Sequence, residues 1–291
     1  MANLKEVRTR IASVSSTQQI TSAMKMVSAA KFRRAQNAIV GMRPYASQLG
    51  EIIANIDTGD GVQTPYHAVR PVKTVALVVV TSNKGLCGAF NSNVLKLAQQ
   101  RVDYWRNEGA AIRMICIGKK ASEQMAKQKD LQLSSHDLLL DAPSFDAVAS
   151  LADTLLDDFA AKRIDHVEIV YNQFKNSLSQ ILSCEQFLPV DSGKMNAESG
   201  KPKANSDFIY EPSKEEIMRE MIPLTLRSTF YRIVLDSLAS EHGARMTAMQ
   251  KATDNATELL KDLRLSYNKA RQAAITNEII EIVSGSEALK G

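Results

Sequence analysis

The fold follows first from one long stretch of sequence, residues 224–284, which reads LTLRSTFYRIVLDSLASEHGARMTAMQKATDNATELLKDLRLSYNKARQAAITNEIIEIVS. It contains no proline, and apolar residues recur at helical spacing, as at Phe230, Val234 and Leu238. A helix of this length would extend roughly 90 Å, against a mean helix of about 12 residues. A chain of this mass cannot bury such a helix along its whole length, so we expect it to pair with another long helix.

A second long helix is predicted at the other end of the chain. Residues 4–42 lack proline and carry an apolar stripe at heptad spacing, which begins with Leu4, Val7, Ile11 and Val14. The same seam then turns polar, and a second stripe through Ile20, Met24 and Val27 is displaced around the helix. Arg43-Pro44 should kink or end the helix, because proline disfavours helix in the residue before it. We expect an antiparallel pair of terminal helices with an asymmetric surface.

Strand and helix signals alternate between the two long helices. Residues 75–80, VALVVV, form a continuous apolar run that is typical of a strand buried on both faces of a parallel sheet. Helices are expected at 93–108, 119–129 and 145–162, and further strands at 112–117, 167–171 and 180–188. The alternation predicts an α/β class protein with a Rossmann-like, open, doubly wound sheet.

These patterns divide the chain into three parts. Residues 1–56 and 213–291 are predicted to form a long antiparallel coiled-coil shaft, and residues 72–190 a Rossmann-like globular domain. Residues 191–212 are rich in Gly, Pro, Ser and Asn and are predicted to form a mobile loop and foot. The second shaft helix should begin at Ser213 as N-cap, with Glu216 closing a capping box.

The composition excludes several classes of protein. Of the 291 residues, 44% are hydrophobic, 23% charged and only 5% aromatic, which favours long helices over a β-sandwich. No stretch approaches the ~18 to 20 apolar residues of a membrane span, and the N-terminus shows neither a signal nor a transit peptide, so a cytoplasmic-type protein is expected. The net charge is +4, but residues 1–43 hold eight basic residues and one acid. Such an arm suits nucleic acid, a membrane surface or an acidic protein.

Residues that could carry chemistry are few. The three cysteines are Cys87, Cys116 and Cys184. They show no paired spacing and each adjoins an apolar run, which favours buried thiols in a reducing compartment. The four histidines lack metal-ligand spacing. The glycine-rich loop 84–88 matches no phosphate-binding motif, and a tight turn with Gly85 or Gly88 at positive φ explains it better. We predict no catalytic residue, no cofactor and no metal.

Long motifs along the chain resemble the gamma subunit of F-type ATP synthase, of the bacterial type. Near the N-terminus they are TQQITSAMKMVSAAK at 17–31 and RPY at 43–45, and KGLCG follows the first strand at 84–88. Near the C-terminus they are SEHGARMTAMQKATDN at 240–255 and YNKARQAAITNEI at 267–279. The resemblance covers essentially the whole chain in one order.

This resemblance implies a central rotor stalk without catalytic residues of its own. In that family the terminal helices form a coiled coil inside a hexamer of three alpha and three beta subunits, and the α/β domain contacts the epsilon subunit and the membrane c-ring. Proton flow turns the c-ring and the stalk together, which couples it to ATP synthesis or hydrolysis at the beta subunits. The implied location is peripheral, on the cytoplasmic face of a bacterial inner membrane, with no membrane insertion and no nucleic acid.

The resemblance also implies contact residues. Positions near an acidic lever loop of a beta subunit match Met24, Lys25 and Arg245. Polar contacts to a beta-subunit loop high in the cavity match Arg271, Gln272 and Thr276. The foot that touches the c-ring matches Phe208, Ile209 and Tyr210. Taken alone, Met24 would be interpreted as ordinary coiled-coil packing; within its motif the contact interpretation is preferred.

Two departures from the family pattern and two alternative interpretations stay open. Gly243 stands where a better helix former is usual, and the end of the chain, 284–291, is more polar than an apolar bearing would prefer. The plastid-type insertion with a cysteine pair is absent, so thiol control is not expected. One alternative is a nucleotide-binding or oxidoreductase domain with helical arms. The other is a coiled-coil adaptor or scaffold with a non-catalytic α/β domain, which would homodimerise through its termini.

Overall fold

The computed structural model describes residues 4–56, 64–128, 130–176, 179–190, 211 and 213–288. By its internal contacts the chain divides into two compact units. The terminal unit comprises Met1–Ser28 and Met246–Gly291, and the central unit comprises Ala29–Arg245. Each unit contains parts of both long helices, and the central unit also contains a five-stranded sheet.

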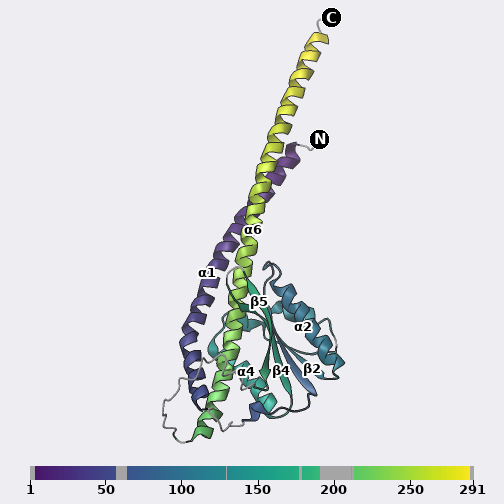
Figure 1. The fold of residues 1–291 in the computed structure, drawn as a ribbon. Helices are drawn as coiled ribbons and strands as arrows, with labels where there is room; N and C mark the ends of the chain where they lie inside the picture. The colour runs from purple at the N-terminus through teal and green to yellow at the C-terminus, as the bar shows by residue number, and fades with distance from the viewer. Residues whose placement is uncertain are drawn as a thin grey trace. The chain divides into compact units, whose positions relative to one another are not determined.

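Both predicted long helices are present (Figure 1). Helix α1 runs over Leu4–Ile56 and helix α6 over Lys214–Ala288. The predicted N-cap of α6 is confirmed, because the hydroxyl of Ser213 accepts a hydrogen bond from the backbone N–H of Glu216 at 3.2 Å. Among the described residues, no helix is both long and apolar enough to cross a membrane.

Each long helix continues through a proline. Of the two outcomes expected at Arg43-Pro44, a kink or an end, the end is wrong, since the helix runs on past Pro44 to Ile56. A proline inside a helix removes one hydrogen bond and costs about 3 kcal/mol. Burial on both sides offsets this loss: Leu49 is buried beyond Pro44, and Ile222 and Leu226 are buried around Pro223.

The sheet of the central unit has the strand order β3-β2-β1-β4-β5. Its strands are β1 Thr74–Val80, β2 Ala111–Ile117, β3 Gln132–Ser135, β4 His166–Phe174 and β5 Gln180–Leu188. The first four are parallel, and β5 pairs antiparallel with β4. Strand β3 was not predicted, because its sequence QLSS contains a single apolar residue.

Helices cover both faces of this sheet, which confirms the Rossmann-like α/β fold. One face packs against α2 (Phe90–Asn107) and α3 (Lys119–Met125). The other face packs against α4 (Phe145–Ala160) and the first part of α6, through Met218 to Val234. Residues 75–80 of β1 are completely buried, as predicted for a strand covered on both sides. Two 3₁₀ helices, Pro65–His67 and Asp137–Leu140, complete the unit.

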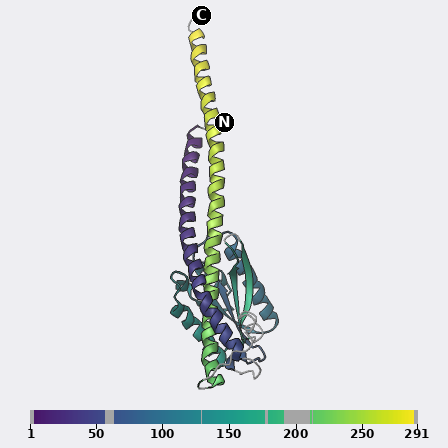
Figure 2. The ribbon, with the colours of Figure 1, turned by 60° about the vertical axis from the view of Figure 1, so that its left-hand side comes forward.

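The two long helices pair antiparallel within each unit. In the central unit, Ala35 and Ile39 of α1 pack with Leu235 and Ala239 of α6, and the helices lie side by side in both views (Figure 1, Figure 2). In the terminal unit, the side chain of Gln18 bonds Thr257 and that of Thr21 bonds Thr253. As residue numbers rise along α1, the numbers of the residues that they contact on α6 fall, so the predicted antiparallel pairing is confirmed.

Candidate functional site

The helix pair of the terminal unit has a polar seam beside the predicted contacts Met24 and Lys25. The hydroxyls of Thr21 and Thr253 lie 2.9 Å apart, and Thr21 is only 9% exposed. Ser28 is buried as well, and its hydroxyl donates to the carbonyl of Met24 at 2.7 Å. Met24 and Lys25 are themselves half-buried. The seam is therefore polar where a uniform coiled coil would place apolar knobs.

Two of the three residues of the displaced apolar stripe of α1 lie in solvent. Ile20 and Val27 are 57% and 58% exposed, while Met24 is half-buried; Met26, next to the stripe, is 64% exposed. Single exposed apolar residues are ordinary, but neighbouring ones on one helix indicate a surface that binds a partner. The asymmetry expected from the shifted stripe is thus carried by side chains that are open to contact.

The other predicted contacts of the terminal unit lie on one exposed stretch of α6. Arg271, Gln272 and Thr276 are all exposed, and the hydroxyl of Thr276 donates to the carbonyl of Gln272 at 2.9 Å. Exposed aliphatic side chains lie among them and after them in sequence: Ile275, Ile279, Ile280, Ile282 and Val283. The predicted c-ring contacts Phe208, Ile209 and Tyr210 lie outside the described residues.

Arg245, predicted as a beta-subunit contact, is buried in the central unit with 8% exposure. Its guanidinium donates to the carboxylate of Glu241 at 2.6 Å and to the carbonyls of Lys84 and Gly85 at 2.7 and 3.2 Å. Burial raises the pKa of Glu241, although Arg245 opposes that rise. Burial and the charge of Arg245 lower the pKa of His242 to about 4, so its imidazole is neutral at pH 7. A partner contact through Arg245 stays a prediction.

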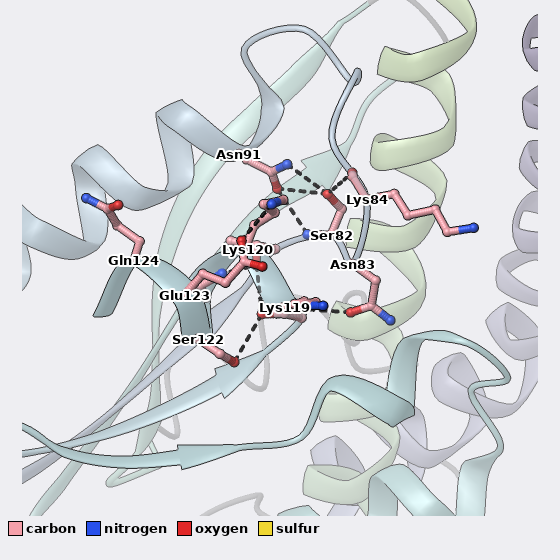
Figure 3. A network of polar contacts seen from close by, with 12 residues as sticks. Ser82, Asn83, Lys84, Asn91, Lys119, Lys120, Ser122, Glu123 and Gln124 are labelled. Carbon is pink, nitrogen blue, oxygen red and sulfur yellow. Dashed lines mark hydrogen bonds and ion pairs between the residues drawn. The ribbon is translucent and has the colours of Figure 1, made fainter. Parts of the chain in front are cut away.

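The carbonyls that Arg245 holds belong to a tight turn after β1. Gly88 has φ +60, which confirms the predicted positive φ, but the second such residue is Leu86 at φ +62 and not Gly85. The hydroxyl of Ser82 donates to the carbonyl of Lys84 at 2.7 Å, and the amide of Asn91 donates to that hydroxyl at 2.8 Å (Figure 3). The sequence indicated this turn but not its tie to α6.

The same turn is joined to the end of β2. The side-chain oxygen of Asn83 accepts from the backbone N–H of Lys119 at 3.0 Å, while the side chain of Lys84 extends away from the network (Figure 3). Gly118, at φ +107, approaches so closely that a Cβ there would lie 2.5 Å from the carbonyl oxygen of Thr81. Hydrogen bonds within the protein therefore fix the geometry of the turn after β1 and of the residues that follow β2.

A buried charged cluster lies between the sheet and α2. Arg101 donates to both carboxylate oxygens of Glu168, at 2.8 and 2.5 Å, and His166 lies 3.2 Å from the same carboxylate. Burial alone would raise the pKa of Glu168, but hydrogen bonds from His166 and Arg101 hold it down at about 2. The cluster is a structural ion pair across 67 residues of sequence.

Cys184 corrects one expectation from the sequence. Cys87 and Cys116 are buried as predicted, but Cys184 is exposed because it lies on the edge strand β5. Its thiol lies 3.6 Å from the carboxylate of Glu168. Partial burial of the thiol and this neighbouring charge raise the pKa of Cys184 to about 12. A thiol with so high a pKa is a poor nucleophile at neutral pH.

An open cleft of about 210 Å³ lies between β2, β3 and α4. In it the hydroxyl of Ser134 lies 2.9 Å from Nε2 of His136, whose pKa is lowered by burial. Asp158 lines the same cleft, but arginines 113 and 163 take up its two carboxylate oxygens, so it does not orient the imidazole. Among the described residues, no three His, Cys, Asp or Glu side chains gather as metal ligands.

Comparisons with known proteins place this geometry in a family. A family model described as ATP synthase matches residues 3–289. The ATP synthase gamma chain of Flavobacterium psychrophilum is 53% identical over 293 residues, which cover 100% of both chains. The chain belongs to the ATP synthase gamma-chain family. Other gamma chains agree: that of Flavobacterium johnsoniae is 52% identical over 100% of both chains, and that of Bacteroides fragilis 46% identical over 99% of this chain and 100% of its own.

Solved structures share the fold of this gamma-family chain. A chain from the central stalk and c-ring structure of the Tetrahymena thermophila mitochondrial ATP synthase is 26% identical, with a TM-score of 0.58 over 80% of this chain and 99% of its own. A chain from the Euglena gracilis mitochondrial ATP synthase has a TM-score of 0.67 over 98% and 94%, at 23% identity. The second likeness concerns the fold alone. The resemblance stated from the motifs is confirmed.

Proposed function

We propose that this chain is the central rotor stalk of a rotary ATP synthase, which turns with a membrane c-ring inside a hexamer of three alpha and three beta subunits. In this role the chain would contribute no catalytic residue, and ATP would be made and hydrolysed on the beta subunits. One observation carries the proposal within a gamma-family chain: α6 exposes its aliphatic side chains at the end where a stalk would enter the hexamer.

These aliphatic residues call for a surrounding partner. Ile279, Ile280 and Ile282 are 55%, 56% and 72% exposed, although they lie on a regular helix. Fully burying one such side chain contributes about 1.5 to 3 kcal/mol. A ring of subunits around the helix would supply that burial without a single fixed contact, which suits a part that must turn.

Polar and basic side chains complete the contacts of the proposed shaft. Met24 and Lys25 would meet the acidic lever loop of a beta subunit, and partly screened charge attraction permits rotation better than tight apolar docking. Arg271, Gln272 and Thr276 are exposed and free to meet a second beta-subunit loop. Their role as contacts is what the resemblance of the motif at 267–279 to the gamma-chain family implies.

The remaining parts take the roles of foot and coupling domain. We assign the shaft to residues 1–56 and 213–291, the domain that meets the epsilon subunit to 72–190, and the foot to 191–212, with Phe208, Ile209 and Tyr210 against the c-ring. The chain would then be peripheral, on the cytoplasmic face of a bacterial inner membrane.

Reconstitution tests the proposal directly. The chain is combined with cognate alpha and beta subunits, and the complex is analysed by native mass spectrometry and by ATP hydrolysis. We expect one copy for every three beta subunits and hydrolysis that depends on the chain. A chain that stays apart from alpha and beta as a homodimer would instead support the adaptor interpretation.

A paired variant tests the contact residues. We expect Arg271→Ala with Gln272→Ala to lower the rate of ATP synthesis about tenfold, because two polar contacts worth roughly 0.5 to 3 kcal/mol each are lost. The control is Lys261→Ala, an exposed residue of the same helix more than two turns away. Equal effects of the two changes would reject the assignment.

A further inference from the structure

Most of the contact between α6 and the α/β domain is apolar. Ile222, Phe230 and Val234 are completely buried against the sheet face that α4 also covers. The hydrophobic effect that drives this packing is non-directional, whereas hydrogen bonds form only over a narrow range of directions. A helix that carries a twisting load needs directed bonds as well.

Arg245 supplies such bonds at the last position of the central unit. Its Nη2 donates to the carbonyls of Lys84 and Gly85, its Nε also donates to Gly85 at 3.3 Å, and its Nη1 donates to Glu241. The guanidinium is planar, with its donors in a fixed fork, so bonds to two neighbouring carbonyls define a direction. Glu241, four residues earlier on the same helix, holds the guanidinium in place.

Burial makes these bonds costly to break. Glu241, His242 and Arg245 are 6%, 7% and 8% exposed. The other charges that face them are Lys31 of α1 and Asp141, which follows the second 3₁₀ helix. A buried charge that loses its partner is strongly unfavourable, so Arg245 cannot leave Glu241 and the carbonyls without a penalty.

The bonded turn is itself tied to the rest of the domain. The carbonyl of Lys84 also accepts from Ser82, whose backbone N–H donates to the side chain of Asn91 on α2 at 3.0 Å. The side chain of the neighbouring Asn83 accepts from the backbone N–H of Lys119 (Figure 3). The same side chain donates to the carbonyl of Asp137 at 2.9 Å. Force applied to this turn therefore reaches β1, α2 and the segments that follow β2 and β3.

We propose that Arg245 is a positioning residue that locks α6 against rotation about its own axis relative to the α/β domain, through the carbonyls of the turn after β1. Torque then passes between domain and helix by directed bonds and not by apolar contact alone. The inference rests on the proposed rotor function for its mechanical meaning, while the lock itself is a property of this chain.

Amide hydrogen exchange in the full chain tests the lock without partners. Arg245→Lys keeps the charge that Glu241 faces but loses the fork. We expect exchange at residues 82–91 to be about tenfold faster in this variant, because the turn loses its bonds to α6. The matched control is Arg232→Lys, since Arg232 also pairs with an acid four residues away, Asp236, on the same helix. Unchanged exchange in the 245 variant, or an equal change in the control, would overturn the proposal.

Rotation measurements in the assembled complex test the mechanical role. A bead is attached to the α/β domain through Lys127→Cys in a Cys184→Ser background, and its angular fluctuation is recorded during catalytic pauses. We expect the angular variance to rise about twofold in Arg245→Lys, because directed bonds are lost. Variance equal to that of the parent contradicts the torque role. A parent chain that forms no complex contradicts the proposed function, and the exchange measurement still decides the lock.

Discussion

At the scale of single residues, the charged cluster of Arg101, His166 and Glu168 shows how burial decides the value of an ion pair. Glu168 is 5% exposed, yet a two-point bond from Arg101 and the contact with His166 keep its carboxylate charged. A buried pair adds little over an apolar replacement, but breaking it leaves a charge without a partner. The ring of Trp105, 5.0 Å from that of His166, reports on this site.

The pKa of Glu168 predicts how the stability of the chain depends on pH. Because the folded pKa of about 2 lies below the ordinary value of 4.5, the carboxylate stabilises the fold above about pH 4.5, and this contribution is lost as the pH falls toward 2. The shift corresponds to about 3 kcal/mol.

The variant Glu168→Gln isolates this contribution. We expect it to lower the free energy of unfolding at pH 7 by about 3 kcal/mol and to flatten the difference between pH 4.5 and 2. Urea unfolding of the full chain, followed by the fluorescence of Trp105, the single tryptophan, measures both. A parent and variant that lose stability in parallel over this range would show that Glu168 is not responsible.

Sequence reasoning reached residue types at this scale but not their partners. The turn at 84–88 was predicted from its glycines, yet Leu86 takes one of the left-handed positions, because the bonds around the turn over-determine its backbone. Arg101 and Glu168 lie 67 residues apart, and only the fold brings them together. Family motifs indicated Arg245, but no sequence pattern reveals the carbonyls that it holds.

At the scale of elements, close approach of backbones joins β1 to β2. Gly118 directly follows β2, has φ +107 and lies against the backbone of Thr81. The hydroxyl of Thr81 accepts from the backbone N–H of Ala121 at 2.9 Å. Gly109, just before β2, also has a positive φ of +76, but no atom lies within 4 Å of the position a Cβ would take. A side chain at Gly109 would therefore meet backbone strain alone, whereas one at Gly118 would meet both backbone strain and a steric clash.

We expect Gly118→Ala to destabilise the chain by about 3 kcal/mol or more, because it adds a clash with a backbone carbonyl to a conformation that alanine disfavours. Gly109→Ala should cost only about 1 kcal/mol, since strain acts there alone. Thermal unfolding by circular dichroism compares the two. Equal losses would indicate that the neighbourhood of Thr81 relaxes around the added methyl group.

The polar seam of the long helices gives a second prediction for an element. The hydroxyls of Thr21 and Thr253 lie 2.9 Å apart, and each also lies within bonding distance of a carbonyl of its own helix, that of Gln18 or of Met249. Because each hydroxyl has one proton, the one that donates across the seam gives up its own helix carbonyl. Either Thr→Val change alone should cost about 1 kcal/mol, because it removes the hydrogen bond across the seam and sets a methyl group against the remaining hydroxyl, whereas the double variant should be close to neutral. A double-mutant cycle on thermal unfolding measures the coupling, and strictly additive losses would contradict it.

Helices and strands were predicted well where apolar residues recur at regular spacing. They were predicted poorly where a local preference, such as that of a proline, is outweighed by tertiary packing. The long helices and most strands follow from apolar spacing, since their partners bury one continuous face. Pro44 suggested a helix end that packing at Leu49 overrides. Strand β3 escaped prediction because it is short, polar and at the edge of the sheet, where pairing with β2 alone defines it.

At the scale of the whole molecule, charge is distributed unevenly along the chain. Residues 1–43 carry eight basic residues and one acid within a chain of net charge +4. Charge of one sign on an extended element attracts acidic partners over a distance of about 10 Å at moderate salt. Association with alpha and beta subunits should therefore begin with this arm.

We expect the association rate with an alpha–beta hexamer to fall about tenfold when salt is raised from about 50 to about 500 mM. Lys25→Ala should lower both the rate at low salt and its salt dependence, because one attracting charge is removed. The control is Lys127→Ala, an exposed charge of the α/β domain. Stopped-flow mixing measures the rates, and a salt dependence that is the same for all three chains would exclude Lys25 from the encounter.

The pairing register in the terminal unit has a further consequence. Gln18 lies opposite Thr257, so an antiparallel partner that begins at Leu4 reaches only about residue 271 of α6. Beyond it α6 continues to Ala288 as a single helix of about 17 residues, a length at which isolated helices are marginal in water. Before assembly this tail should fray, and binding must then supply its conformational entropy. The end of α6 would then become fully helical only when it binds its partner subunits. The cost of ordering it lowers the binding affinity and makes dissociation easier.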